Sequence, residues 1–248
     1  MERFSRIRSF LGEDGFTLLQ RSFITIVGIG AVGGHVAEGL ARAGVGRLRL
    51  VDFDIIQPSN INRQIMALES TLGQPKVEAA QERIAAINSR CRVEALQLFA
   101  DDTSVEQILA PAPDILIDAI DSMNPKVQLL TAAHSRRIPV ISSMGAALRS
   151  DPTLIRTGDL MDTRNCPLAK RLRQKLRRAG IDRGISCVYS TEAVTWRYDE
   201  QEEETPIPDT PYADRGRKRR SLGSLPTLTG IFGLVIANAV ILRLTGKE

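Results

Sequence analysis

Short apolar runs alternate with amphipathic stretches along the first 150 residues. The apolar runs predict buried strands at residues 23–27, 47–51, 93–98, 114–118 and 138–142. Between them, apolar residues recur at spacings of three and four, which predicts helices, and a charged stretch with helical spacing precedes the first strand. Strands that alternate with helices predict an α/β fold with a mainly parallel sheet and helices on both faces.

The helix predicted at residues 75–88 begins with Pro75, a residue favoured at the first helical position. Its apolar stripe contains Val77, Ala80, Ile84 and Ile87. Lys76 then falls in the first turn, where the helix dipole disfavours a cation. A lysine at this position predicts a nearby anion.

The remaining residues, 151–248, contain shorter and more mixed elements. Apolar runs predict strands at 154–157 and 193–198, and the apolar stretch 226–245 predicts a final helix that packs on the sheet. Residues 199–226 contain five acids near their start, then prolines and a basic run, and we expect a mobile crossover loop there. The second half is therefore expected to be a smaller, mixed part of the same domain.

A glycine-rich turn, Gly28-Ile29-Gly30-Ala31-Val32-Gly33, links the first predicted strand to the first alanine-rich helix. Such glycines allow the backbone to approach a phosphate at the amino end of a helix. Asp52 ends the second strand and is placed to hydrogen-bond a ribose hydroxyl. The pattern predicts a nucleotide at the carboxyl edge of a Rossmann-like, doubly wound sheet, so that residues 1–150 form the nucleotide-binding half of a single domain, 1–248.

A polar cluster after the second strand favours a triphosphate over a dinucleotide. Asp54 adds a second carboxylate, and Asn60, Asn62, Arg63 and Gln64 fall within five positions. Arginine contacts phosphate oxygens with two N–H groups, and amides fill the remaining acceptors. A nicotinamide cofactor has no evident use for this cluster.

Two further carboxylates, Asp118 and Asp121, follow the fourth predicted strand at the edge where open α/β sheets bind ligands. We expect Asp118 to support the end of the strand. The small-residue loop 143–147, after the fifth strand, is a candidate entry for substrate. His35 and His134 have no partner pattern and are interpreted as structural.

Taken together, GIGAVG, DFD, NINRQ and GQPK resemble the MoeB/ThiF/HesA superfamily of adenylating enzymes, which are related to ubiquitin activators. The resemblance implies ATP and Mg²⁺ as cofactors, with Lys76 on the phosphates and Asp121 holding the metal ion. It also implies a homodimer in which Arg6 reaches the partner's triphosphate. It leaves open a monovalent cation, Na⁺ or K⁺, and a sulfur-transfer or cysteine desulfurase partner.

We therefore assign two overlapping sets of residues. The catalytic candidates are Arg6, Arg63, Lys76 and Asp121. The nucleotide-binding candidates are Gly28, Gly30, Ala31, Gly33, Asp52, Asp54, Asn60, Asn62, Arg63, Gln64, Lys76, Asp121 and Ser122.

A basic helix is predicted at residues 165–180, within a segment, 164–183, that contains eight basic residues and one acid. A solvated helix normally mixes charges of both signs, so this face indicates a polyanion. No aromatic residues lie between the cations, which favours contacts to phosphates and shape, as for folded RNA. The candidate tRNA-binding residues are Lys170, Arg171, Arg173, Lys175, Arg177 and Arg178.

The segments DLMDTRNCPLAKRLRQKLR and CVYSTE resemble the tRNA threonylcarbamoyladenosine dehydratase branch of the superfamily. That branch implies adenylation of the carboxylate of N6-threonylcarbamoyladenosine in tRNA, followed by ring closure and release of AMP. Adenylation of a small carrier protein ending in Gly-Gly is an alternative, and a non-catalytic ATP-binding RNA or protein scaffold is another. A nicotinamide-linked dehydrogenase is a more distant alternative.

The cysteines and the apolar segments of the chain bear on its metal binding, cysteine chemistry and cellular location. The three cysteines form no CxxC pair, and the predicted crossover loop contains none, so we expect neither a zinc clamp nor a cysteine relay. The start of the chain has no apolar core segment, and the apolar run 230–242 is too short to span a bilayer. We expect a cytoplasmic protein that makes no membrane contact.

Overall fold

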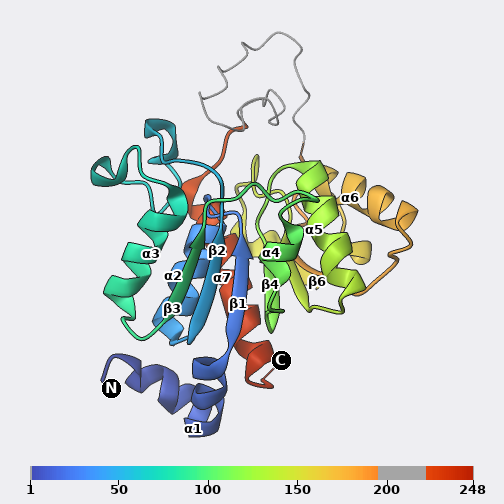
Figure 1. The fold of residues 1–248 in the computed structure, drawn as a ribbon. Helices are drawn as coiled ribbons and strands as arrows, with labels where there is room; N and C mark the ends of the chain where they lie inside the picture. Colours follow the sequence, from blue (N-terminus) through green and yellow to red (C-terminus); the bar gives the residue numbers. More distant parts are fainter. Residues whose placement is uncertain (1, 195–221, 248) are drawn as a thin grey trace.

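A seven-stranded sheet forms the centre of the protein in a computed structural model that describes residues 2–194 and 222–247 (Figure 1). The strand order is β3-β2-β1-β4-β5-β7-β6. The strands are β1 (Phe23–Val27), β2 (Arg47–Val51), β3 (Arg92–Leu96), β4 (Ile115–Asp118), β5 (Val140–Ser143), β6 (Ile155–Asp159) and β7 (Ser186–Ser190). Neighbouring strands are parallel except β6 and β7, which are antiparallel. The predicted α/β fold, with a mixed C-terminal part, is confirmed.

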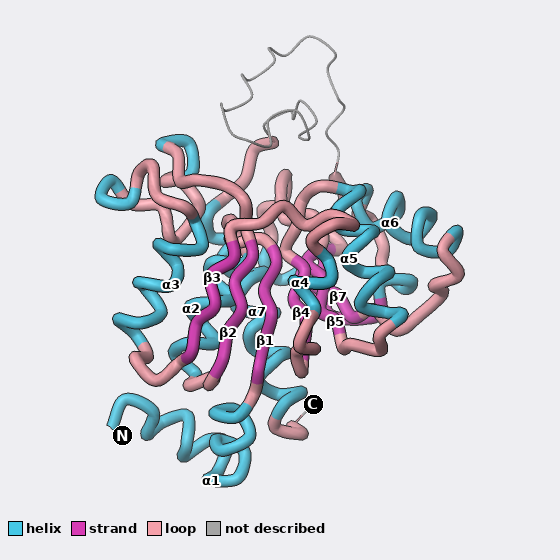
Figure 2. The backbone as a smooth tube through the Cα atoms, in the orientation of Figure 1, coloured by secondary structure: helices cyan, strands magenta, loops and turns pink. Residues whose placement is uncertain are grey.

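Helices cover both faces of the sheet (Figure 2). They are α1 (Ser5–Arg21), α2 (Gly33–Ala43), α3 (Lys76–Ile87), α4 (Val105–Leu109), α5 (Met123–Ser135), α6 (Pro167–Arg178) and α7 (Pro226–Leu244). Helices α2, α3 and α7 share one apolar core with the sheet, and α4, α5 and α6 share the other. Alternate strand residues supply the two cores: Ile115 and Ile117 enter the first, and Leu116 enters the second.

Helix α7 extends beyond the apolar run 230–242, so the expectation that this segment is too short to span a bilayer is wrong: the helix has the length and apolar composition that a membrane-crossing helix would need. Phe232, Ile236 and Val240 are nevertheless buried in the core of the domain, as predicted for the final helix. Its backbone also approaches α2 closely, because a Cβ on Gly233 would lie 2.5 Å from Val32 O. The helix therefore braces the amino end of α2.

One predicted strand is wrong. Ala193 and Val194 lie in irregular structure, and the rest of the predicted strand 193–198 lies outside the described residues. The strand is instead β7, whose short sequence, Ser-Cys-Val-Tyr-Ser, is a weak signal. Pairing with β5 and β6 on its two sides determines this strand. The predicted loop 199–226 lies outside the described residues as far as residue 221.

Candidate functional site

The glycine turn after β1 is shaped by close backbone contacts. Gly28 has φ of +94°, its N–H donates to Val51 O at 2.8 Å, and a Cβ there would lie 2.7 Å from Ala119 O. A Cβ on Gly33 would lie 1.8 Å from Gly28 O. Both positions therefore require glycine for the chain to fold.

Gly30 differs from these two glycines. Among the described residues, a Cβ at Gly30 would approach only Gln64 Nε2, at 4.0 Å. Packing therefore does not require glycine at this position, and the space in front of it is open to a ligand. No side chain of the described residues caps the first turn of α2 behind it. The amino end of a helix without a side-chain cap suits an anion.

Asp52 at the end of β2 is almost fully buried and holds the glycine turn in place. Its Oδ2 accepts from the Ile29 N–H at 2.7 Å, and its Oδ1 accepts from the Asp54 N–H at 2.9 Å. Burial raises the pKa of this carboxyl. The sequence predicted a ribose contact for Asp52 and missed its role in the turn.

In the structure the anion beside Lys76 is Asp54, and the phosphate contact implied by the family resemblance stays a prediction. Lys76 Nζ donates to Asp54 Oδ2 at 2.8 Å, and the lysine is only 5% exposed. Burial acts to lower the pKa of Lys76, but the charges of Asp52, Asp54 and Asp121 raise it above its usual value. The structure therefore gathers a charged lysine and three carboxylates from the ends of β2 and β4 and the start of α3.

The polar cluster after β2 is divided between internal contacts and exposure. Asn60 Oδ1 accepts from the Gln57 N–H at 3.0 Å, so this side chain stabilises its own turn. Arg63 is half-buried and donates to Ser59 O at 3.0 Å and to Asn62 Oδ1 at 2.8 Å. Gln64 is buried and lies next to Gly30.

Asp118 supports the end of β4, as expected. It is fully buried and accepts from Lys126 Nζ at 2.7 Å and from Ser142 Oγ at 2.6 Å. Lys126 Nζ also donates to Ile120 O at 3.0 Å, and the Ile120 N–H donates to Asp118 Oδ1 at 3.1 Å. Lys126 thereby fixes the segment that leads to Asp121, and sequence reasoning did not identify it.

Asp121 and Ser122 follow this segment, with Asp121 exposed and Ser122 preceding α5. Asp52, Asp54 and Asp121 surround Lys76 without forming a metal site, and no three His, Cys, Asp or Glu side chains in the described part of the chain are arranged to hold a metal ion. A single exposed carboxylate nevertheless fits Mg²⁺, which proteins commonly bind through one or two carboxylates together with substrate phosphates.

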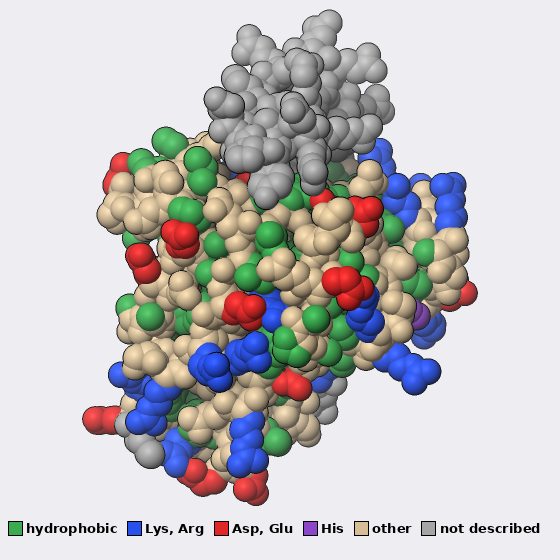
Figure 3. Space-filling model, in the orientation of Figure 1, with side chains coloured by type: hydrophobic (Ala, Val, Ile, Leu, Met, Phe, Trp, Pro, Cys, Tyr) green, Lys and Arg blue, Asp and Glu red, His purple; other side chains and the backbone are tan. Residues whose placement is uncertain are grey.

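The basic residues of α6 have two different roles. Arg173 donates to Thr163 O at 3.0 Å, and Lys175 donates to Asn124 Oδ1 at 3.2 Å, so both join α6 to neighbouring segments. Lysine and arginine side chains also gather on the outer side of α6 in Figure 3. The exposed cations of the predicted set are Lys170, Arg171, Lys175, Arg177 and Arg178, and Arg173 is half-buried.

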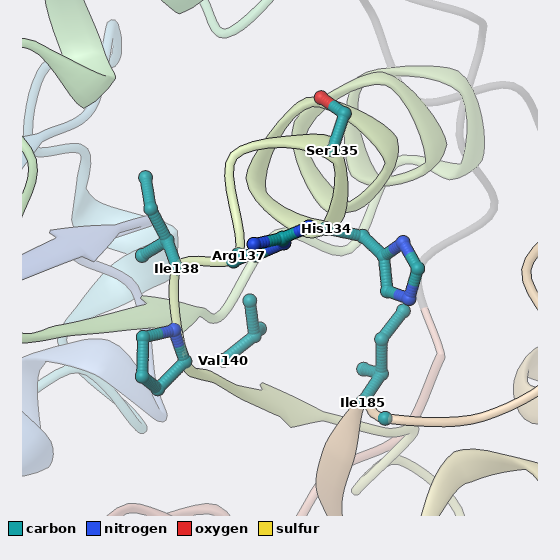
Figure 4. Close-up of a pocket in the computed structure, with 8 residues that line it drawn as sticks. His134, Ser135, Arg137, Ile138, Val140 and Ile185 are labelled. Atoms are coloured by element: carbon teal, nitrogen blue, oxygen red, sulfur yellow. The ribbon is translucent and has the colours of Figure 1, made fainter.

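Two other groups lie away from this edge of the sheet. Arg6 is exposed on α1, which lies at the amino ends of the strands, opposite the glycine turn (Figure 1). A cavity of about 460 Å³ also lies at the amino ends of β5 and β7 (Figure 4). His134, Arg137 and Ile185 are among the residues that line it. Within one chain, neither Arg6 nor this cavity belongs to the glycine-turn site.

The cysteines are poorly suited to nucleophilic chemistry. Cys166 and Cys187 are buried, and burial raises the pKa of Cys187 to about 12. Burial also raises the pKa of Cys91 to about 11. Thiols with such pKa values are almost entirely protonated at neutral pH.

Comparisons with known proteins give consistent results. The ThiF family model matches residues 4–248. The chain is 43% identical over 193 residues to the tRNA threonylcarbamoyladenosine dehydratase of Bacillus subtilis, covering 78% of this chain and 76% of that protein. It is 35% identical to the Escherichia coli dehydratase over 99% of this chain and 94% of that protein.

Solved structures agree with the sequence matches. The E. coli dehydratase in complex with AMP has a TM-score of 0.87 and 33% identity, covering 99% of this chain and 95% of that one. Its complex with ATP has a TM-score of 0.86 with the same identity and coverage. The molybdopterin-synthase adenylyltransferase of E. coli is 35% identical but matches only 56% of this chain.

Proposed function

The chain belongs to the ThiF family, and we propose that it is a tRNA threonylcarbamoyladenosine dehydratase that uses ATP. In this reaction the carboxylate of N6-threonylcarbamoyladenosine is adenylated, and the modified side chain then closes into a ring with loss of AMP. The single observation that supports the proposal most strongly is the match to a dehydratase over almost the whole chain, including the basic helix α6.

The nucleotide is placed at the carboxyl edge of the sheet. Its phosphates lie in the open space at Gly30 and at the uncapped start of α2, and its ribose lies near Asp52. Lys76 is oriented by Asp54 before the nucleotide binds, so its ammonium group is already charged and directed to this edge. Arg63, which Asn62 holds at 2.8 Å, supplies a second cation.

The protein holds one anion against another in the adenylation step. The substrate carboxylate oxygen attacks the α-phosphorus of ATP, and diphosphate leaves. Lys76 and Arg63 lower the repulsion between these anions, which is the main task in phosphoryl and nucleotidyl transfer. Asp121 is the residue that would hold Mg²⁺, and that ion supplies neutralisation of the triphosphate charge when bound.

Ring closure needs no nucleophile from the protein. An atom of the same threonylcarbamoyl group attacks the activated acyl carbon, and AMP leaves. Intramolecular attack of this kind reaches effective molarities on the order of 10⁵ to 10⁸ M. The buried Cys166 and the buried, protonated thiol of Cys187 are consistent with a route that uses no cysteine relay.

Several parts of the site rest on the family resemblance together with the position of the residues. Arg6 is on α1, at the end of its own subunit opposite the glycine turn, so in this proposal it contacts the triphosphate of the partner in a homodimer. The exposed cations of α6 bind the phosphate backbone of the tRNA. A cytoplasmic location, a monovalent cation and a sulfur-transfer or cysteine desulfurase partner stay predictions.

Incubation with ATP, Mg²⁺ and tRNA that carries threonylcarbamoyladenosine tests the proposal. The expected product is a nucleoside lighter by the mass of one water, with one AMP formed for each nucleoside converted. Unchanged tRNA would reject the proposal. Diphosphate exchange that depends on a Gly-Gly-ending carrier protein would favour the carrier alternative, and ATP binding without turnover would favour the scaffold.

A further inference from the structure

A buried arginine in the loop after β5 has donors that no described residue satisfies. Arg149 is 3% exposed, and its Nη2 donates to Asn165 O at 2.8 Å. Its Nε and Nη1 are buried and have no acceptor among the described residues. Leaving a buried donor unpaired costs about 1–3 kcal/mol, and more when the group is charged. Such groups are rare in native proteins and call for an explanation such as an absent ligand.

The backbone around Arg149 is strained. Only three non-glycine residues in the described part of the chain have positive φ, and two of them adjoin this arginine. Leu148, which precedes Arg149, has φ of +60°, and Asn165, which accepts its hydrogen bond, has φ of +54°. The left-handed conformation costs a residue such as leucine about 1–2 kcal/mol. Strain of this kind persists where the surrounding structure holds a functional geometry.

The surrounding contacts hold both strained residues in place. The Leu148 N–H donates to Gly223 O at 2.9 Å, and Asn165 Nδ2 donates to Thr191 O at 2.8 Å. Segments that follow β5 and β7 and precede α6 and α7 therefore meet at Arg149. A guanidinium held from this many sides is fixed in position before any ligand binds.

Glu192 interacts electrostatically with Arg149, but its carboxylate is hydrogen-bonded to other groups. It accepts from the Ser150 N–H at 2.9 Å, from Ser150 Oγ at 2.9 Å and from the Asp151 N–H at 3.0 Å. These donors lower the pKa of Glu192, and the charge of Arg149 contributes to the lowering. The described residues include no salt bridge between Glu192 and Arg149, so the arginine keeps two donors for another anion.

The position of Arg149 indicates which anion this is. It follows the carboxyl end of β5, the neighbour of β4, whose end leads to Asp121. Its hydrogen-bond partner Asn165 lies two residues before the basic helix α6. Arg149 therefore lies at the same edge as the nucleotide and next to the start of the surface that faces RNA.

We propose that Arg149 binds an oxyanion of the RNA substrate through Nε and Nη1 and so positions the reacting nucleoside. This inference rests on the proposed function. The oxyanion is either the carboxylate of the threonylcarbamoyl group or a backbone phosphate beside it, because both offer the same acceptor chemistry. Arginine suits either group, since its charge is permanent and its donors are fixed in one plane.

The decisive variants are R149Q and R149A. R137Q is the control, because Arg137 is an arginine that is exposed at the opposite end of the sheet. We expect R149Q to lose at least about tenfold in single-turnover rate or tRNA affinity, equivalent to about 1.4 kcal/mol. ATP affinity, measured from its protection against thermal unfolding, should stay within about twofold of the wild type, and R137Q should match the wild type.

Two further arms separate the ligand sources and the roles of the residue. Affinity for tRNA with and without the threonylcarbamoyl group should fall equally in R149Q if the ligand is a phosphate, and only for modified tRNA if it is the carboxylate. Guanidinium ions should partly restore R149A, since they replace the missing donors. Unchanged tRNA affinity and turnover in R149Q would overturn the inference. The inference would also be overturned if R149Q had a lower melting temperature and lower ATP affinity together with its loss of turnover, and if guanidinium did not restore R149A.

The same measurements separate this inference from the proposed function. Wild-type protein that binds the tRNA but forms no dehydrated nucleoside would reject the proposed function. The loss of tRNA affinity in R149Q would still be measurable in that case. A wild type that converts the tRNA, together with an R149Q variant that binds and converts it equally well, would reject only the role of Arg149.

Discussion

The buried pair of Lys126 and Asp118 leads to a quantitative prediction for K126M. Both side chains are completely buried, with Nζ and Oδ2 2.7 Å apart. At an effective dielectric constant of about 20, charges at this separation attract by about 6 kcal/mol. Ser142 Oγ and the Ile120 N–H remain as donors to Asp118, so only part of this is lost. We expect K126M to lower the free energy of unfolding by about 3–5 kcal/mol, as when one partner of a buried pair is removed.

Urea unfolding followed by circular dichroism measures this loss. R42M is the control, because Arg42 pairs with Glu38 at the surface, and its removal should cost no more than about 1 kcal/mol. The double variant D118N/K126M removes both charges and should recover a large part of the stability. A loss below about 1 kcal/mol in K126M, or a double variant that is less stable than K126M, would refute the reasoning.

The same variant should also affect nucleotide binding. Lys126 Nζ donates to Ile120 O. The preceding residue packs against the glycine turn, because a Cβ on Gly28 would lie only 2.7 Å from Ala119 O. The segment between β4 and Asp121 therefore supports the glycine turn directly. We expect K126M to bind ATP more weakly than the wild type under conditions where both are fully folded. Equal ATP affinity would show that this support does not reach the site.

Four further predictions follow from the structure. G30A should keep the wild-type melting temperature but bind ATP at least about tenfold more weakly. G33A should instead lose stability, because its Cβ would lie 1.8 Å from Gly28 O. Thermal unfolding with and without ATP measures both effects. C187A should keep full turnover, and the Cys187 thiol should resist iodoacetamide in the folded protein at pH 8, since its pKa is about 12. Folding raises the pKa of Lys76, so the charged lysine contributes its full stabilisation below the unfolded pKa of about 10.4 and loses it as pH rises through the folded pKa. The difference in unfolding free energy between the wild type and K76M should therefore shrink above about pH 10.4. Replacing Lys170, Arg171, Arg177 and Arg178 with glutamine should weaken tRNA binding and reduce the salt slope of log K by about 3, in filter binding over a salt series.

Much of the nucleotide site can be predicted from local sequence patterns. The buried strands β1 and β4 follow from short, largely apolar segments, because strands covered on both faces carry mostly apolar side chains. Apolar runs depend on residues close together in sequence, so local patterns predict these strands. A cation at a helix start also predicts a nearby anion, but the pattern did not identify Asp54, 22 residues earlier in the chain, as the partner of Lys76.

The tertiary structure decided which polar groups hold the fold and which remain available to a ligand. Arg173 and Lys175 read as members of a basic face, but contacts with residues 163 and 124 attach them to the domain. Lys126 and Arg149 have no distinctive sequence pattern, and their importance comes from burial among segments distant in the chain. Desolvation and hydrogen bonding depend on what surrounds a charged group in three dimensions, and sequence spacing does not specify those surroundings.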